Sequence, residues 1–367
     1  MALTKEQILE KLKQVQVPES DKTLADLVKD LRVADSDILI EMELDRQTAV
    51  LKRSIERATR EILEPYKEQG YNVMLNIIEK KMSFQKVQIN KPPAQPLEQV
   101  KNIIAVASGK GGVGKSTVAA NLAAALATTG AKVGLLDADL YGPSIPTMFG
   151  LENQKPYVER IEGKDYILPI KKYNVDVISL GFFVKPEDAV IWRGAMATNA
   201  IKQLLSDVYW GELDYFIIDL PPGTGDIPLT LVQTIPITGG LIVTTPQKVA
   251  ISDVVKAINM FRNEKINVPV LGIIENMSWF TPAECPQYKY HIFGKGGGEY
   301  LSKTYNIPLL GQVPLIMSIV EDGDNGQPTV LKENDPNAEV FRQIAEKLIK
   351  EVERRNNELP PTEILRI

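Results

Sequence analysis

Residues 109–117 read GKGGVGKST, which matches the phosphate-loop pattern G-x-x-x-x-G-K-[ST]. An apolar stretch, NIIAVAS at 102–108, precedes this segment, and a helix-forming stretch, TVAANLAAALATTG at 117–130, follows it. In such an arrangement the backbone N–H groups of the loop point at phosphate oxygens, and the positive end of the helix dipole adds to the attraction. The strand–loop–helix context therefore predicts a site for the phosphates of a nucleotide.

The side chains of the loop have separate expected roles. Lys115 should reach the β- and γ-phosphates, and the Ser116 hydroxyl should ligate Mg²⁺. A glycine-rich turn without a ligand is the alternative, which the flanking strand and helix disfavour. The predicted nucleotide-binding residues of the loop are Gly109, Lys110, Gly111, Gly112, Val113, Gly114, Lys115, Ser116 and Thr117.

Acidic residues end two other predicted strands. Asp137 closes the apolar run at 132–137 and is followed by Asp139, while Asp219 closes the run DYFIID at 214–219. A single Asp at the end of a strand is usually a turn cap, but parallel strands end at one edge of a sheet, where ligands bind. Three such acids favour a functional role, in which the carboxylates hold Mg²⁺ or a water molecule.

Short apolar runs separated by helix-length segments recur after residue 100. Buried parallel strands have this pattern because helices cover both faces of their sheet. Residues 100–367 therefore predict an α/β domain with a doubly wound, mainly parallel sheet, and a charged amphipathic helix follows at 337–356. The predicted strands lie at 102–108, 132–137, 214–219, 240–245, 268–274 and 308–314.

The first ninety residues predict a separate, small α+β domain. Thr4 and Gln7 form a capping-box pattern that opens a helix, and residues 46–66 predict a second, charged amphipathic helix. Alternating apolar residues at 38–44 and 73–77 predict strands.

A proline-rich linker separates the two predicted domains. The segment KPPAQPLE at 91–98 carries three prolines, which neither a helix interior nor a central strand tolerates. We therefore expect a small domain at 1–90, a linker at 91–99 and a larger domain at 100–367, which suits the length of 367 residues.

Composition excludes several classes of protein. The chain has one Cys and one His, so neither a disulfide framework nor a single-chain metal site of several such ligands is expected. The net charge of −5 argues against binding nucleic acid or an anionic membrane through bulk charge. Neither a signal-peptide pattern nor an apolar run long enough for a bilayer is present, and we expect a cytoplasmic protein.

The second lysine of the loop, Lys110, makes the sequence resemble the deviant Walker A loop of the ParA/MinD/nitrogenase-reductase class of dimeric P-loop ATPases. Beyond the loop, the chain resembles the Mrp/ApbC family of iron–sulfur cluster carrier ATPases. Residues 1–90 resemble the small domain that is often fused ahead of this ATPase. The similar stretches lie at 137–144, 192–196, 219–226, 245–250, 275–278 and 292–298.

The resemblance implies a homodimeric ATPase with a low intrinsic rate that uses ATP and Mg²⁺. Its expected partners are an iron–sulfur scaffold and the apoproteins that receive clusters. Lys110 would act on the ATP of the partner subunit, in the manner of an arginine finger, and Asp139 would position the attacking water. Two-fold symmetry makes each such lysine serve the opposite site.

The resemblance also implies ligands for the metal and the base. Asp137 and Asp219 would bind Mg²⁺ through water, beside Ser116. Asn276, together with the region of Pro314, would hold the adenine.

The chain departs from the family at the expected C-x-x-C pair. Cys285 is present, but Tyr288 occupies the position of the second cysteine. One thiolate per chain gives two across a dimer, whereas a [4Fe–4S] cluster normally has four. His291 lies close in sequence, so two interpretations stay open: an unusual Cys₂His₂-like site between two copies, or loss of the cluster site.

Other functional classes remain as alternatives. A cluster-free, ATP-gated scaffold fits the incomplete cysteine pair. A MinD- or ParA-like positioning switch would need a basic C-terminal amphipathic helix or a basic surface, whereas the chain ends in LPPTEILRI and carries a net charge of −5. We therefore expect no nucleic-acid partner and no stable membrane association. An electron-transfer reductase would need two cluster cysteines per chain.

Overall fold

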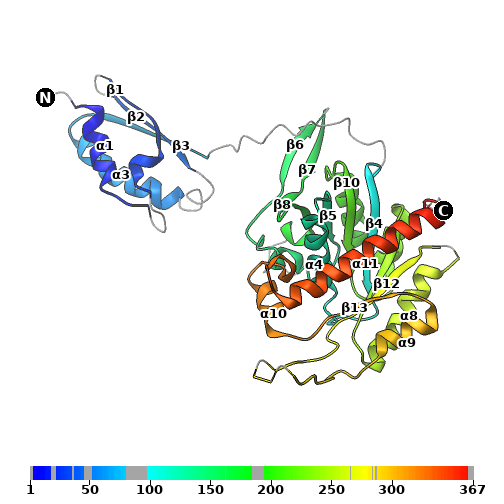
Figure 1. Cartoon of the computed structure of the whole chain (residues 1–367). Coiled ribbons are helices and arrows are strands. Elements are labelled where there is room, and N and C mark those ends of the chain that lie inside the picture. Colours follow the sequence, from blue (N-terminus) through cyan, green and yellow to red (C-terminus); the bar gives the residue numbers. More distant parts are fainter. Residues whose placement is uncertain are drawn as a thin grey trace. The chain divides into compact units, whose positions relative to one another are not determined.

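The computed structural model divides the chain into two compact units, residues 1–88 and residues 89–367 (Figure 1). The buried apolar side chains form one cluster in the N-terminal unit and two in the larger unit. The structure describes residues 3–17, 22–34, 37–44, 52–79, 97–161, 163–183, 194–264, 266–282, 284–285 and 287–362.

The described residues of the N-terminal unit form a three-stranded sheet, in the strand order β1-β2-β3, together with the helices α1 and α3. Its elements are α1 (Lys5–Lys13), the 3₁₀-helix η1 (Leu24–Leu27), β1 (Val28–Ala34), β2 (Asp37–Leu44), α3 (Lys52–Glu68) and β3 (Asn72–Glu79). The capping box is confirmed, since the Thr4 N–H donates to Gln7 Oε1 at 3.1 Å. The start of the predicted helix at 46–66 lies partly outside the described residues. Strand β1 was not predicted, because Lys29, Asp30 and Arg32 interrupt its apolar pattern.

The larger unit is built on an eight-stranded sheet in the order β13-β12-β11-β4-β10-β5-β9-β8. Every neighbouring pair is parallel except β8 with β9, which confirms the predicted doubly wound, mainly parallel sheet. The six predicted runs correspond to β4, β5, β10, β11, β12 and β13. The strands are β4 (Val100–Ser108), β5 (Val133–Asp137), β8 (Ile170–Lys172), β9 (Val175–Ser179), β10 (Leu213–Asp219), β11 (Gly239–Thr244), β12 (Val270–Glu275) and β13 (Leu309–Gln312).

Two short strands and a separate hairpin at one side of the sheet were not predicted. β8 and β9 are only 3 and 5 residues long and carry charged residues. The hairpin consists of β6 (Tyr157–Ile161) and β7 (Lys164–Leu168), in which exposed residues predominate. Short strands with mixed polarity give no clear apolar run, so local pattern alone does not identify them.

Alternate residues of the central strand β4 point into different cores. Ile103, Ala105 and Ala107 belong to one buried cluster, and Ile104 and Val106 belong to the other. This burial on both faces is the reason why the strand reads as a continuous apolar run.

Helices cover both faces of this sheet. One core includes apolar residues of α6 (Gly194–Ser206), α7 (Asp226–Thr234), α8 (Lys248–Arg262) and α9 (Gly297–Tyr305). The other includes residues of α4 (Lys115–Thr128), α5 (Ile145–Met148), α10 (Met317–Asp324), the 3₁₀-helix η3 (Thr329–Leu331) and α11 (Pro336–Glu358). The predicted C-terminal helix is α11, which Figure 1 shows running across this face.

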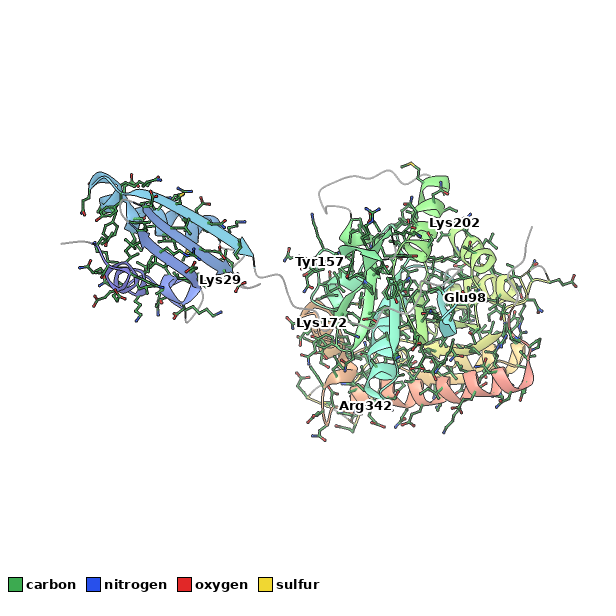
Figure 2. The ribbon with its side chains drawn as sticks, turned by 90° about the horizontal axis from the view of Figure 1, so that it is seen from above. Lys29, Glu98, Tyr157, Lys172, Lys202 and Arg342 are labelled. Atoms are coloured by element: carbon green, nitrogen blue, oxygen red, sulfur yellow. The ribbon has the colours of Figure 1, made fainter. Side chains whose placement is uncertain are left out.

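Hydrogen bonds fasten α11 to the preceding chain. Arg342, labelled in Figure 2, donates from Nη2 to the carbonyl oxygens of Val330 and Lys332 at 3.0 and 2.6 Å. Next to α11 on the same face of the sheet lies α4, whose alanine-rich sequence fits a helix that is buried nearly all round. Among the described residues, no helix is both long and apolar enough to cross a membrane.

The parallel register brings the ends of three strands together. Asp219 of β10 lies opposite Asp137 of β5 on one side and opposite Val106 of β4 on the other. Since β4 leads directly into residues 109–114, the phosphate loop and the two acids meet at the carboxyl edge of the sheet.

We expect deletion of residues 1–90 to leave a folded, nucleotide-binding protein, because the buried clusters of the two units are built from separate stretches of sequence. Urea unfolding of the truncated chain should remain a single cooperative transition, with nucleotide affinity within about twofold of the full chain. Loss of cooperativity would mean that the larger unit depends on the smaller one.

Candidate nucleotide site

Close backbone packing defines the phosphate loop. Gly112 and Gly114 both have φ +77°, a left-handed conformation that glycine adopts without strain. A Cβ atom on Gly114 would lie 2.1 Å from Nδ2 of Asn276, and one on Gly109 would lie 2.3 Å from the carbonyl carbon of Asp253 in α8. The glycines therefore let the loop lie directly against the ends of β12 and α8.

A cavity of about 210 Å³ lies over the loop. Eight of the nine predicted loop residues line it, together with the predicted water-positioning residue Asp139. Gly109 is packed against α8, and Asp137 and Asp219 are fully buried. The lining residues are Ser108, Lys110, Gly111, Gly112, Val113, Gly114, Lys115, Ser116, Thr117, Asp139, Ser144, Met148 and Pro222.

Lys115 forms a buried ion pair at the base of this cavity. Its Nζ lies 2.6 Å from Oδ1 of Asp219 and 3.8 Å from Oδ2 of Asp139. The Lys115 side chain is 6% exposed and that of Asp219 is 0% exposed. The second carboxylate oxygen of Asp219, Oδ2, is buried without a hydrogen-bond partner, so it is available for another positively polarised group.

Asp137 lies beside this pair and is held by three donors. Its carboxylate accepts hydrogen bonds from Ser179 Oγ at 2.9 Å, from the Asp139 N–H at 3.1 Å and from the Ile145 N–H at 3.3 Å. Burial raises the pKa of Asp137 to about 7, and the neighbouring Asp219 carboxylate acts in the same direction. Ser179 was missed by sequence reasoning, because only the register of β9 against β5 places it opposite Asp137.

The donors at this edge suit Mg²⁺, which prefers oxygen ligands. The unpartnered Oδ2 of Asp219 and the buried carboxylate of Asp137 could receive its bound water, and the Ser116 hydroxyl lines the cavity. Burial also raises the pKa of Asp139. A cation at this edge would relieve the cost of keeping these carboxylates charged.

Asn276 connects the phosphate loop to the end of β12. Its side-chain Nδ2 donates to the Val113 carbonyl at 2.9 Å, and its backbone N–H donates to the Thr244 carbonyl at 2.7 Å. Pro314 is buried next to Val313, whose N–H donates to the Glu275 carbonyl at 2.9 Å. The fold thus brings Asn276 and Pro314 to neighbouring strand ends, and their contact with adenine stays a prediction.

The side chain of Lys110 contacts another residue of the same chain. Its Nζ donates to Oε1 of Gln247 at 3.1 Å, and Gln247 immediately precedes α8. Sequence reasoning did not single out Gln247, although it belongs to the stretch 245–250 that carried the family resemblance.

Cys285 lies on the segment between β12 and α9, which leaves the carboxyl edge of the sheet where β12 ends. Beyond β12 the chain stays paired with the end of β13, since Leu315 donates to the Trp279 carbonyl at 2.7 Å. Phe280 and Tyr290 then exchange two backbone hydrogen bonds of 2.8 Å, which enclose Cys285 between them. The thiol-bearing residue is half-buried.

Cys285 and His291, the two candidate metal ligands, occupy different parts of this segment. Cys285 lies within the Phe280–Tyr290 bridge, whereas His291 lies beyond it, with Nδ1 2.9 Å from the Ser278 carbonyl oxygen. Among the described residues, no group of three or more His, Cys, Asp or Glu side chains could hold a metal ion. A site built from Cys285 and His291 would therefore need further ligands from outside the described residues.

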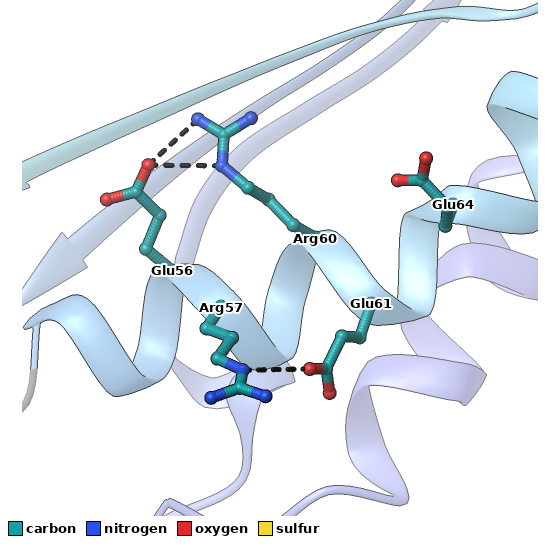
Figure 3. A pocket seen from close by; sticks show the side chains of 5 residues that line it. All are labelled: Glu56, Arg57, Arg60, Glu61 and Glu64. Atoms are coloured by element: carbon teal, nitrogen blue, oxygen red, sulfur yellow. Dashed lines mark hydrogen bonds and ion pairs between the residues drawn. The ribbon is translucent and has the colours of Figure 1, made fainter.

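Charged side chains line a second hollow, on α3 of the N-terminal unit (Figure 3), and Glu64 among them pairs with Lys67 at 2.9 Å. Glu56, Arg57, Arg60, Glu61 and Glu64 line it. Arg60 pairs with Glu56 at 2.8 Å and Arg57 with Glu61 at 3.0 Å, all on the solvent side of the helix. These are helix-stabilising pairs of small energy.

Of the stretches that carried the family resemblance, the start of 192–196 lies outside the described residues.

Comparison with known proteins gives consistent results. Residues 99–349 match the family model for ParA, described as the NUBPL iron-transfer P-loop NTPase. A Synechocystis protein named iron-sulfur cluster carrier protein is 43% identical over 336 residues, covering 90% of this chain and 92% of the relative. An Escherichia coli protein of the same name is 48% identical over 294 residues, covering 78% of each. The structure of a nucleotide-binding protein from Archaeoglobus fulgidus, solved with ADP, is similar with a TM-score of 0.56 and 39% identity, over 66% of this chain and 92% of that one.

The raised pKa of Asp137 predicts a pH-dependent effect of Asp137→Asn on stability without nucleotide or Mg²⁺. Between the ordinary pKa of 3.8 for an Asp side chain and about 7, the folded protein keeps a proton that the unfolded chain has lost, so stability falls as pH rises through this window. The neutral Asn side chain lacks this cost. The melting temperature of the variant relative to wild type should therefore be higher at pH 8 than at pH 5, by about 3 °C or more. An equal difference at both pH values would contradict the assignment.

Proposed function

This chain belongs to the ParA-type family of iron-transfer P-loop NTPases, and we propose that it is an ATPase that carries iron–sulfur clusters to apoproteins in the cytoplasm. The observation that carries the proposal is the phosphate loop with two lysines, Lys110 and Lys115, next to buried acids at the carboxyl edge of the sheet. The relatives named as iron–sulfur cluster carriers support the cargo.

Nucleotide binding exchanges the partner of Lys115. A phosphate that enters the cavity offers Lys115 a stronger anion than the Asp219 carboxylate, so the 2.6 Å ion pair opens as the lysine turns to the β- and γ-phosphates. Asp219 and Asp137 would then be free to hold Mg²⁺ through water, and Ser116 would supply a hydroxyl ligand. When bound, Mg²⁺ would neutralise charge on the phosphate oxygens.

Hydrolysis requires residues of two copies. Asp139 lines the cavity and is 14% exposed, so its carboxylate can orient the attacking water. Lys110 of a second copy would stabilise charge on the transferred phosphoryl group. Since the ammonium group of Lys110 reaches the phosphates only from a second copy, we propose a homodimer with a low intrinsic rate of ATP hydrolysis.

The cargo is an iron–sulfur cluster of the [4Fe–4S] type, and Cys285 is the thiolate that the chain offers to it. Two copies supply two thiolates, so scaffold or apoprotein partners would complete the ligands during transfer. This open coordination suits a transient cargo rather than a resident cofactor. We propose no nucleic-acid partner and no stable membrane association.

A cluster-free scaffold, gated by ATP, is the second candidate function. Tyr288, at the position of the family's second cysteine, is 54% exposed and makes a tilted ring contact with Tyr290 at 6.4 Å. An exposed aromatic pair is a surface for protein partners rather than for a metal.

The two lysines should separate binding from turnover. Lys115→Ala is expected to weaken ATP binding by at least about 100-fold, since it removes the cation that faces the phosphates. Lys110→Ala should bind ATP within about threefold of wild type but lose turnover by at least about 100-fold. Calorimetry and phosphate release measure the two quantities. Normal turnover in Lys110→Ala would rule out the action of this lysine on a second copy.

Cluster binding is tested by iron and acid-labile sulfide after anaerobic reconstitution. One [4Fe–4S] cluster shared by two copies predicts about two iron and two sulfide per chain. Cys285→Ala should lose both while keeping its ATP turnover, which serves as the control for folding. Absence of iron from both proteins would favour the cluster-free scaffold.

A further inference from the structure

The resting position of Lys110 depends on one side chain. Its ammonium group donates to Oε1 of Gln247 at 3.1 Å. Within the part of the chain that the structure describes, Lys110 makes no ion pair. The positive charge therefore rests on a neutral amide, in contrast to Lys115, which rests on a buried carboxylate.

The backbone on both sides of this contact is closely packed. A Cβ atom on Gly109 would lie 2.3 Å from backbone atoms of both Asp253 and Val254, so the start of the phosphate loop lies directly on α8. A Cβ atom on Gly297 would lie 3.0 Å from Cα of Pro246, the residue before Gln247. Since close packing surrounds both backbones, the side chains of Lys110 and Gln247 are the parts that can separate.

The chemistry of the acceptor determines how easily they separate. A hydrogen bond from an ammonium group to a neutral amide is weaker than one to a phosphate oxygen. Lys110 can therefore leave Gln247 at small cost when the phosphates of another copy come within reach. A carboxylate in place of the amide would compete with those phosphates.

We propose that Gln247 is a positioning residue that holds Lys110 on its own chain and sets the nucleotide concentration at which two copies pair. This role rests on the proposed function, in which Lys110 acts on the nucleotide of a second copy. Gln247 is not among the residues that line the cavity over the phosphate loop; it acts through the lysine.

The test uses the full chain with Mg²⁺ and a non-hydrolysable ATP analogue, and measures pairing by sedimentation velocity. Gln247→Leu removes the acceptor, so half-maximal pairing should need about 3-fold to 10-fold less analogue than wild type. Gln247→Glu supplies a carboxylate, so pairing should need about 10-fold more. Each variant should bind ADP within about twofold of wild type, because Lys110 meets only the nucleotide of the other copy.

A matched control separates the contact from the change in charge. Lys248→Gln changes the net charge by the same amount as Gln247→Glu, at an exposed neighbouring position, and should shift pairing by less than about twofold. In a Lys110→Ala background, the differences among the three residues at position 247 should disappear.

Two results would overturn the proposal. One is wild-type pairing in both Gln247 variants, or a shift of both in the same direction. The other is persistence of their difference in the Lys110→Ala background. Failure of the proposed function looks different, since Lys110→Ala alone would then keep its ATP turnover.

Discussion

The ion pair between Lys115 and Asp219 is the contact around which the nucleotide site is arranged. Both groups are almost completely removed from water, and an isolated charge in such a place costs several kcal/mol. Lys115 therefore needs an anion, which is Asp219 in this structure and, on our proposal, a phosphate when nucleotide is bound. Once Lys115 turned to phosphate, Asp219 would need a cation in its place. This proposed exchange gives a reason for the presence of a loop lysine, buried acids and a magnesium-type donor set at the same edge of the sheet.

The register of the parallel sheet makes that arrangement possible. β10 lies between β4 and β5, so Asp219 ends beside Asp137 and next to the strand that enters the phosphate loop. Asn276, at the end of β12, ties the same loop to the segment that carries Cys285. The proposed nucleotide site and the segment that carries Cys285 therefore both begin at the carboxyl ends of strands in the same sheet.

The two lysines of the loop differ in their anchors and, on our proposal, in their functions. Lys115 is held by a buried carboxylate, and its exchange is coupled to the entry of phosphate into its own chain. Lys110 is held by the neutral amide of Gln247 and can be given to another copy at little cost. A strong internal anchor suits a residue that stays within its site, and a weak one suits a residue that must leave.

The local parts of this protein follow from the order of its amino acids: the phosphate loop, the six apolar strands and the C-terminal helix. A loop motif is a run of adjacent residues, and a strand buried on both faces needs a continuous apolar run. Both patterns can therefore be recognised in the amino-acid sequence. Short strands of mixed polarity, such as β8 and β9, could not be recognised in this way, because their burial depends on the elements that pack against them. Which distant side chains meet depends on how the strands and helices pack. Ser179 reaches Asp137 through strand register, and Gln247 reaches Lys110 across 137 residues through the packing of α8 on the loop. Such contacts are set by how elements pack in space, which no local pattern encodes.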